Sequence, residues 1–256
     1  MTKTVKVGSC QTPEIIGDPL KALDYILKLS KEASEKKVDL LLFPECFLSG
    51  YILNKTYMEK YSFDFKSRQF SKILKQLINI TPTIVFGISE KNDGKLYNSA
   101  VVVNRGNIIG VYRKTHLINP NELFFTPGNR YPIFDVNGLK YGINICYDAQ
   151  FPEAAKAIAE QGANLLLLPA QNMIPREKAE YWKYKHNEIR SLRVLENNFW
   201  YVSSDVTGVR PAAENSVERI CYGPTSIMNP KAEIIAQVPL MTTGLITADI
   251  PVNQKI

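Results

Sequence analysis

Three residues that could do chemistry stand at the ends of apolar runs in this sequence. Glu45 follows the run LLLFP, Lys114 follows NIIGVYR, and Cys146 follows YGINI. Apolar runs of this kind are typical of strands buried in a sheet. Since ligands bind beyond the carboxyl ends of strands in open α/β sheets, we expect the three side chains to meet at one site.

A cysteine, a glutamate and a lysine that meet in this way can cleave a carbonyl compound. The nucleophile is the thiolate, and a thiol needs a base or a positive neighbour to ionise at neutral pH. A desolvated Glu45 would have a raised pKa, and it could take the proton of Cys146 and later give it to a departing amine. Lys114 and the backbone N–H of Tyr147 could stabilise the negative charge of a tetrahedral intermediate. A thioester then forms, and water activated by Glu45 hydrolyses it.

Each of these residues, taken alone, also has an ordinary explanation. Cys146 could be a small buried hydrophobe beside an incidental turn. Glu45 could be a partly exposed loop carboxylate, and Lys114 a solvated strand end. His116 and His186, the two histidines of the chain, compete as candidate bases, although neither stands in a familiar setting for a Cys–His or Ser–His pair.

The stretches around these residues resemble the nitrilase superfamily of carbon–nitrogen hydrolases. The glutamate motif is matched by LLLFPECFLSGY, the lysine motif by YRKTHL and the cysteine motif by GINICYDAQFPE, and similar stretches extend from residue 4 to residue 250. The resemblance implies that Glu45, Lys114 and Cys146 are catalytic. It adds Glu122, in NELFFTPG, as a second glutamate that positions the lysine or the substrate amine.

The resemblance also indicates a branch of the family. The CYDxxFPE pattern points to ω-amidase-like enzymes, whereas true nitrilases commonly carry tryptophan where this chain has Tyr147. We therefore expect hydrolysis of a small-molecule amide, with N-carbamoyl-amine hydrolysis or nitrile hydrolysis by the same residues as alternatives. A non-catalytic binding or scaffold protein is the alternative from another class. Gln150 departs from the arginine that many members carry before Phe-Pro-Glu.

Two further residues are candidates for supporting roles. Asn172 follows the apolar run ANLLLLPAQ, so it stands at another strand end and is a candidate for substrate contact. Asp148 is expected to cap the turn after the cysteine. Aromatic residues in the following helix, Trp182 among them, are assigned to helix packing, although one of them could face the pocket.

Strands and helices alternate along the chain, which favours an α/β fold. Two hairpin signals, RGN after residue 104 and the pair Asn229–Pro230, argue against a purely parallel sheet. Two sheets packed face to face with helices outside would accommodate both features, and the resemblance implies this four-layer α-β-β-α sandwich. Family members commonly pair through helices near the cysteine, so we expect a homodimer.

Two helices carry specific expectations. Asp18 is expected to cap a helix that begins at Pro19, with Leu20, Leu23 and Leu27 on one face. Residues 176–197 are expected to form one long helix.

The composition is that of a globular protein with a large core. Of the 256 residues, 45% are hydrophobic, and no repeat or low-complexity linker interrupts the chain, so we expect one domain over residues 1–256. The four cysteines are far apart and form no CxxC pair. This spacing argues against a disulfide scaffold or a zinc site and for a reducing compartment. The mechanism needs no metal and no organic cofactor.

Charge and hydropathy argue against two further classes. The net charge is +6, but the lysines and arginines are spread along the chain, so we expect no nucleic-acid binding. The first stretch, MTKTVKVGSCQTPE, lacks the apolar core of a signal peptide, and no apolar run reaches the length of a membrane span. We therefore expect a soluble, cytoplasmic protein whose partner is a small molecule.

Overall fold

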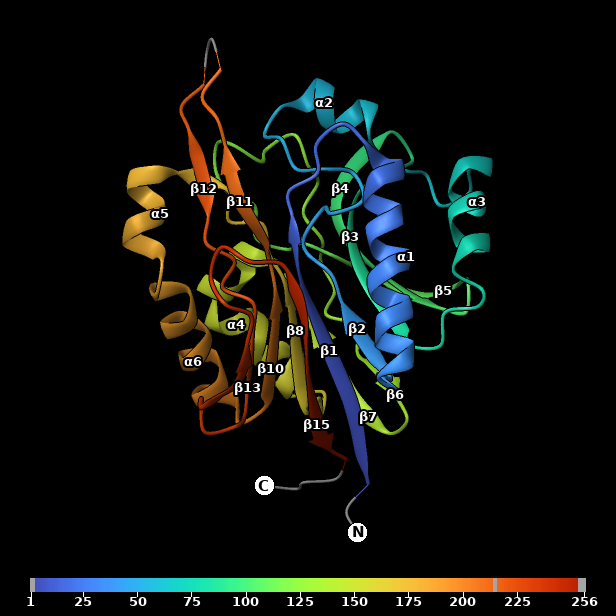
Figure 1. The fold of residues 1–256 in the computed structure, drawn as a ribbon, viewed down its shortest axis with the longest axis vertical. Helices are drawn as coiled ribbons and strands as arrows, with labels where there is room; N and C mark the ends of the chain where they lie inside the picture. The colour runs from blue at the N-terminus through green and yellow to red at the C-terminus, as the bar shows by residue number, and fades with distance from the viewer. Residues whose placement is uncertain (1–2, 214–215, 253–256) are drawn as a thin grey trace.

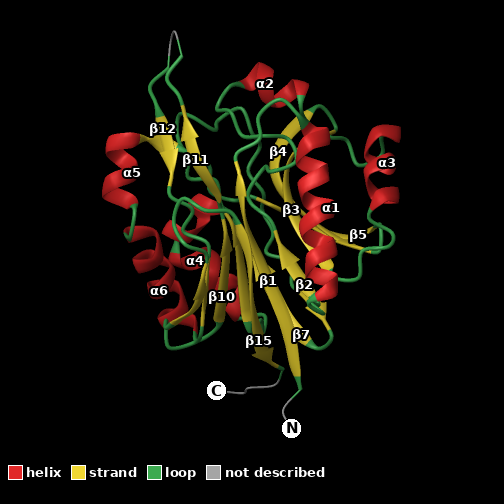
Figure 2. Ribbon diagram, viewed as in Figure 1, coloured by secondary structure: helices red, strands yellow, loops and turns green. Residues whose placement is uncertain are grey.

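Two β-sheets packed face to face form the centre of the computed structural model, which describes residues 3–213 and 216–252 (Figure 1). Helices α1 (Pro19–Glu35) and α3 (Arg68–Gln76) cover the outer face of the first sheet. Helices α4 (Pro152–Ala159) and α6 (Lys185–Asn197) cover the outer face of the second. Figure 2 shows the helices on both outer sides of the strands. The expected α-β-β-α sandwich is confirmed.

The first sheet has the strand order β5-β4-β3-β2-β1-β11-β12-β9, and β15 pairs with β1. Its strands are β1 (Thr4–Pro13), β2 (Leu40–Leu42), β3 (Thr83–Asn92), β4 (Lys95–Asn104), β5 (Asn107–Arg113), β9 (Ile174–Pro175), β11 (Val206–Arg210), β12 (Arg219–Cys221) and β15 (Gly244–Pro251). Strands β1, β2 and β3 are parallel, whereas β3, β4 and β5 form an antiparallel meander. Its last turn holds Arg105 at φ 45° and Gly106 at φ 75°, as a two-residue hairpin loop requires.

The second sheet has the order β14-β13-β10-β8-β7-β6. Its strands are β6 (Phe134–Val136), β7 (Leu139–Ile143), β8 (Leu165–Pro169), β10 (Trp200–Ser204), β13 (Ser226–Met228) and β14 (Ile234–Gln237). The three central strands β7, β8 and β10 are parallel, and the edges are antiparallel hairpins. The expected hairpin at Asn229 is confirmed, because its Oδ1 accepts the backbone N–H groups of Lys231 and Glu233.

The alternation of side chains along each strand separates the core into layers. Leu40 and Leu42 point into the apolar layer between the two sheets, while Leu41 packs beneath α1 and α3. Leu165 and Leu167 meet the same inter-sheet layer, and their neighbours on β8 pack beneath α4 and α6. Because both faces of these strands are covered, the sequence runs are continuously apolar.

The helix expectations were partly wrong. Asp18 caps α1, since its side chain accepts the N–H of Lys21, but Leu20 is 74% exposed and does not join Leu23 in the core. The segment 176–197 is two helices, α5 (Arg176–Trp182) and α6. Helix α5 packs against β9 and β12, whereas α6 packs against α4 and β10, so one straight helix could not reach both surfaces.

The remaining short elements are α2 (Lys55–Lys60) and the 3₁₀ turn η1 (Cys146–Gln150). Within the part of the chain that the structure describes, no helix has both the length and the apolar composition needed to cross a bilayer.

Candidate active site

The predicted residues lie just beyond the carboxyl ends of strands from both sheets. Glu45 follows β2 and Lys114 follows β5 in the first sheet, while Cys146 follows β7 and Asn172 follows β8 in the second. A backbone hydrogen bond of 3.2 Å, from the N–H of Glu45 to the carbonyl of Ala170, ties the two sets together. The site therefore lies where the carboxyl ends of strands from the two sheets meet.

The loop that carries Glu45 depends on a glycine in the neighbouring strand. A Cβ added to Gly87 on β3 would stand 2.1 Å from the backbone nitrogen of Cys46 and 2.7 Å from the Cα of Glu45. Only glycine leaves room for the loop to pack this closely. The N–H of Gly87 also donates to the carbonyl of Pro44 at 3.1 Å, which fixes the loop to the strand.

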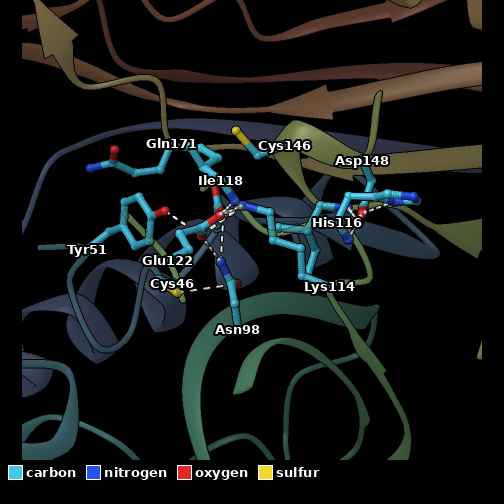
Figure 3. A network of polar contacts seen from close by, with 12 residues as sticks. Cys46, Tyr51, Asn98, Lys114, His116, Ile118, Glu122, Cys146, Asp148 and Gln171 are labelled. Atoms are coloured by element: carbon cyan, nitrogen blue, oxygen red, sulfur yellow. Dashed lines mark hydrogen bonds and ion pairs between the residues drawn. The ribbon is translucent and has the colours of Figure 1, made fainter. Parts of the chain in front are cut away.

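Lys114 is held between two carboxylates. Its Nζ lies 3.0 Å from Glu45 Oε1 and 3.0 Å from both carboxylate oxygens of Glu122. Figure 3 shows Lys114 and Glu122 together with Tyr51 and Asn98. All three side chains are fully buried. Burial opposes the charge of the lysine, but Glu45 and Glu122 together raise the pKa of Lys114 well above its ordinary value. Lys114 is therefore a fixed cation inside the protein.

The two glutamates differ in their remaining hydrogen bonds. Glu122 is saturated: besides Lys114, it accepts the Tyr51 hydroxyl at 2.5 Å, the Ile118 backbone N–H at 2.8 Å and the Asn98 amide at 3.3 Å. Glu45 Oε1 accepts Asn98 at 2.7 Å, but Oε2 of Glu45 is buried without a partner among the described residues. A buried carboxylate oxygen without a donor is costly, and it is free to take a proton.

The environment of Glu45 also favours proton uptake. Burial raises the pKa of Glu45, the negative charge of Glu122 adds to this, and Lys114 opposes it, with a raised pKa as the result. A carboxylate whose pKa is nearer to neutrality is a better general base and a better general acid than an ordinary one. The free Oε2 thus distinguishes Glu45 from Glu122, and the raised pKa of Glu45 suits it to proton transfer.

Cys146 occupies a strained bend. Its φ is 45°, in the left-handed region, which costs a residue with a side chain about 1–2 kcal/mol. Asp148 holds the bend, because its Oδ2 accepts the Ile145 N–H at 2.8 Å, and the predicted capping role is confirmed. The bend opens η1, whose first N–H beyond the cysteine is that of Tyr147.

Asp148 also joins the cysteine bend to the segment after Lys114. It accepts the hydroxyls of Tyr112 and Thr115 at 2.7 and 3.0 Å and the backbone N–H of His116 at 2.8 Å. The His116 ring stacks on Phe151, and its Nδ1 lies 3.1 Å from Asp148. Within residues 3–213 and 216–252, no hydrogen bond joins His116 to Cys146, so the histidine supports the bend and is not placed as its base.

The Cys146 sulfur has two polar neighbours on the loop after β8. Its thiol donates weakly to Asn172 Oδ1 at 3.8 Å, and the backbone of Gln171 acts to lower the pKa of the thiol. The residue is partly buried and faces a cavity, and burial raises the pKa of the thiol well above its ordinary value, with a further contribution from Glu45. The resting group is a thiol, so attack on a substrate requires removal of its proton.

A cavity of about 290 Å³ opens at Cys146. Tyr147, Gln150 and Asn172 line it near the sulfur, and Lys178 and Trp182 of α5 and His186 of α6 line its other side. Burial, with the nearby charge of Arg190, lowers the pKa of His186 to about 3, so this histidine is neutral at pH 7. None of the lining residues is an aspartate or a glutamate.

The sequence reasoning missed this second wall and several supporting groups. Trp182 was assigned to helix packing, with a position facing the pocket as the alternative, and it lines the cavity. His186 was considered only as a base. Tyr51 and Asn98, which hold the carboxylates, were not singled out, although Tyr51 ends the glutamate motif LLLFPECFLSGY. Among the described residues, no cluster of three or more histidine, cysteine, aspartate or glutamate side chains could hold a metal ion.

Comparison with known proteins gives consistent results. The family model for carbon-nitrogen hydrolases matches residues 6–254. A nitrilase of Pyrococcus abyssi is 34% identical over 91% of this chain and 84% of its own length. The omega-amidase NIT2-A of Xenopus laevis is 28% identical over 88% of this chain and 82% of its own length.

Solved structures share the fold. A carbon-nitrogen hydrolase from Helicobacter pylori superposes with a TM-score of 0.83 at 22% identity, over 97% of this chain and 89% of that one. An amidase of the nitrilase superfamily from Nesterenkonia superposes with a TM-score of 0.80 at 20% identity, over 98% and 92% of the two chains.

Proposed function

Because this chain belongs to the carbon-nitrogen hydrolase family, we propose that it hydrolyses the amide of a small molecule through a thioester on Cys146. The observation that carries the proposal is the pairing of a fixed cation, Lys114, with a buried carboxylate whose second oxygen is free, Glu45. A cation aimed at developing negative charge and a base without a competing donor are what acyl transfer to a thiol requires.

In the first step, the Cys146 sulfur attacks the amide carbon while its proton passes to Glu45. The raised pKa of the thiol means that the proton leaves as the new S–C bond forms, and the raised pKa of Glu45 makes it a suitable acceptor. The former carbonyl oxygen becomes an oxyanion. Lys114 and the backbone N–H of Tyr147 stabilise it.

In the second step, the C–N bond breaks, and Glu45 returns the proton to the leaving nitrogen. Ammonia or an amine departs, and the acyl group remains on the sulfur as a thioester. Water then attacks the thioester, Glu45 takes one of its protons, the S–C bond breaks, and that proton restores the thiol of Cys146. The product is the free acid, and the protein returns to its starting state.

Glu122 has a different role in this scheme. Its oxygens already accept hydrogen bonds from Lys114, Tyr51, Asn98 and Ile118, so it has no free position for a proton. We assign it to holding the Lys114 ammonium where the oxyanion forms. This agrees with the role implied for the second glutamate of the family.

Within the family we propose the ω-amidase-like branch, with N-carbamoyl amines and nitriles as the alternative substrates. Support comes from Tyr147 after the cysteine and from similarity to the omega-amidase of Xenopus laevis, whereas the similarity to a nitrilase supports the nitrile alternative. A cavity of about 290 Å³ is at the small end of ligand pockets, which favours a small substrate. The mutual contacts of Glu45, Lys114 and Glu122 weigh against a purely non-catalytic binding protein.

The test is ammonia or amine release from a panel of α-keto-acid amides, aliphatic amides, carbamoyl-putrescine-like compounds and nitriles. Activity that disappears in Cys146→Ala is the expected result, and the best substrate identifies the branch. Release that persists in Cys146→Ala, or a lack of activity across the panel, would contradict the proposal.

We also propose that the chain forms a homodimer through α5 and α6. Helix surfaces there carry large apolar side chains with exposed fractions of 51–68%: Tyr181, Tyr184, Leu192 and Leu195. Exposed apolar patches of this kind often mark interfaces. Light scattering is expected to give twice the 28.9 kDa of one chain, and Leu192→Glu together with Leu195→Glu should give the monomer. A monomer in the unmodified protein would contradict the proposal.

A further inference from the structure

The side chain of Asn172 is held in one orientation by Asp205, which follows β10. Asn172 donates twice to this carboxylate: its amide Nδ2 lies 2.5 Å from Oδ2, and its backbone N–H lies 3.1 Å from Oδ1. Asp205 is fully buried. With the amide nitrogen turned to Asp205, the amide oxygen points toward the Cys146 sulfur, at 3.8 Å.

The other neighbours of Asp205 confirm the direction of these bonds. Its Oδ1 also accepts the Val206 backbone N–H at 2.9 Å and the Cys221 thiol at 3.4 Å, and the guanidinium of Arg190 lies 3.9 Å from Oδ2. Every group around the carboxylate is a donor or a cation, so Asp205 acts as an acceptor throughout. An asparagine amide has a donor end and an acceptor end, and such a partner determines which end faces the site.

We propose that Asn172 Oδ1 accepts a hydrogen bond from an N–H of the substrate, and that Asp205 is the positioning residue that fixes this polarity. The inference rests on the proposed function and deepens it, because it assigns a specificity determinant within that same site. It predicts that the site favours substrates that carry hydrogen on the reacting nitrogen.

The reason lies in the number of polar groups on each substrate. In an amide the oxygen needs donors, which Lys114 and the Tyr147 N–H supply, and the –NH₂ group needs acceptors, of which Asn172 Oδ1 is one. A nitrile has a single heteroatom without hydrogen, and the leaving oxygen of an ester has no hydrogen either. Neither compound can use the acceptor, so the preference for amides depends on the Asn172–Asp205 pair.

The test compares three compounds with the same acyl chain: the primary amide, the nitrile and the methyl ester. In Asn172→Ala the acceptor is gone, and we expect kcat/KM for the amide to fall about tenfold, the scale of one hydrogen bond, relative to the ester and the nitrile. The ester serves as the reference for acylation of Cys146 where the nitrile reacts too slowly to measure.

Asp205→Asn tests the positioning role without a change of size. The new amide places an –NH₂ donor where Oδ2 stood. Two donors cannot pair, so the Asn172 amide rotates to present its oxygen to residue 205 and its nitrogen to the site. We expect the amide-to-ester ratio of kcat/KM to fall about tenfold here as well. Cys221→Ser is the matched control, because it keeps a donor to Asp205 and leaves the Asn172 amide in its orientation. Its amide-to-ester ratio of kcat/KM should equal that of the unmodified protein.

The outcomes separate this inference from the proposed function. Amide hydrolysis that depends on Cys146, with amide-to-ester ratios unchanged in Asn172→Ala and Asp205→Asn, overturns the inference and leaves the proposed function intact. If the unmodified protein hydrolyses no amide, the proposed function fails and the inference fails with it. If Asp205→Asn does not fold, as judged by its thermal transition, the ratio in Asn172→Ala decides alone.

Discussion

The two sheets contribute to the candidate site in opposite ways. On the side of the first sheet, Glu45, Lys114 and Glu122 are fully buried and joined by contacts of 3.0 Å. On the side of the second sheet, Cys146 and Asn172 face a cavity of about 290 Å³ whose far wall is formed by α5 and α6.

The difference follows from what each side must do. A cation that stabilises an oxyanion is effective only if it is already in place and shielded from water, which requires burial and neighbours that hold it in position. Burial of charges is costly, and it is tolerated because each charge has a partner. In the proposed mechanism the substrate side needs room instead: Cys146 and Asn172 lie at strand ends, and the far wall of the cavity stands on α5 and α6.

The comparison predicts that changes in the buried cluster destabilise the protein. Lys114→Met leaves two buried carboxylates without their cation, and we expect a loss of about 3–5 kcal/mol in the free energy of unfolding together with loss of activity. Urea denaturation measures the first effect. Lys95→Met, at an exposed lysine, is the matched control and should change stability by no more than about 0.5 kcal/mol. Equal stabilities of the two variants would contradict this account of the cluster.

Within the cluster, Glu122→Gln should be the next largest effect. The new –NH₂ group would face donors from Lys114, Tyr51 or Ile118, and an unsatisfied buried group costs about 1–3 kcal/mol. We expect reduced stability and reduced kcat, because the Lys114 ammonium loses its position. An unchanged free energy of unfolding would show that Glu122 is not saturated as described.

On the cavity side, the lowered pKa of His186 predicts that the free energy of unfolding depends on pH. Its pKa is lowered to about 3 in the folded protein from an ordinary 6.5, so the unfolded chain takes up a proton that the folded one does not. Stability from this group is complete above pH 6.5 and is lost as the pH falls toward 3. Between pH 7 and pH 4.5, the free energy of unfolding should therefore fall in both proteins, and the fall should be smaller in His186→Gln by at least about 1 kcal/mol. Parallel losses in urea titrations at the two pH values would contradict the burial of a neutral His186.

The smallest effect on stability is expected at the rim of the cavity. Lys178 is exposed and lines the cavity from α5, so Lys178→Ala should change the free energy of unfolding by no more than about 0.5 kcal/mol. Its effect should appear in KM and in the preference between charged and neutral substrates, with kcat retained. A change in kcat alone would mean that the two sides are not as separate as described.

The residues at the strand ends, on both sides of the site, could be predicted from the sequence to a large extent. Glu45, Lys114 and Cys146 follow strands whose apolar runs are local features, and the position after a strand end does not depend on distant packing. The same rule nominated Asn172, and it would have nominated Asp205, which ends the run WYVSSD. The alternation of apolar strands and helices indicated the α/β class, and the four-layer sandwich was implied by the resemblance to the family.

The far wall of the cavity and the contacts that support the strand-end residues could not be predicted in this way. The break between α5 and α6 is decided by two separate packing surfaces, and it determines that Trp182 and His186 face the cavity. The contact between Asn98 and Glu45 joins residues 53 positions apart, so no local pattern contains it. Leu20 illustrates the same limit, since the helical period placed it with Leu23 although its side chain is 74% exposed.

The central claim is that Glu45, with its free oxygen, moves the proton that Glu122 cannot. The most direct measurement is kcat/KM for the best amide from pH 4 to pH 9 in the unmodified protein and in Glu45→Gln. We predict that the unmodified protein loses activity as the pH falls through the Glu45 pKa, which lies above its ordinary 4.5. Glu45→Gln should be slower by a factor of about 10²–10⁴ and should lack this acid limb. A Glu45→Gln protein with the rate and the acid limb of the unmodified protein would contradict the account.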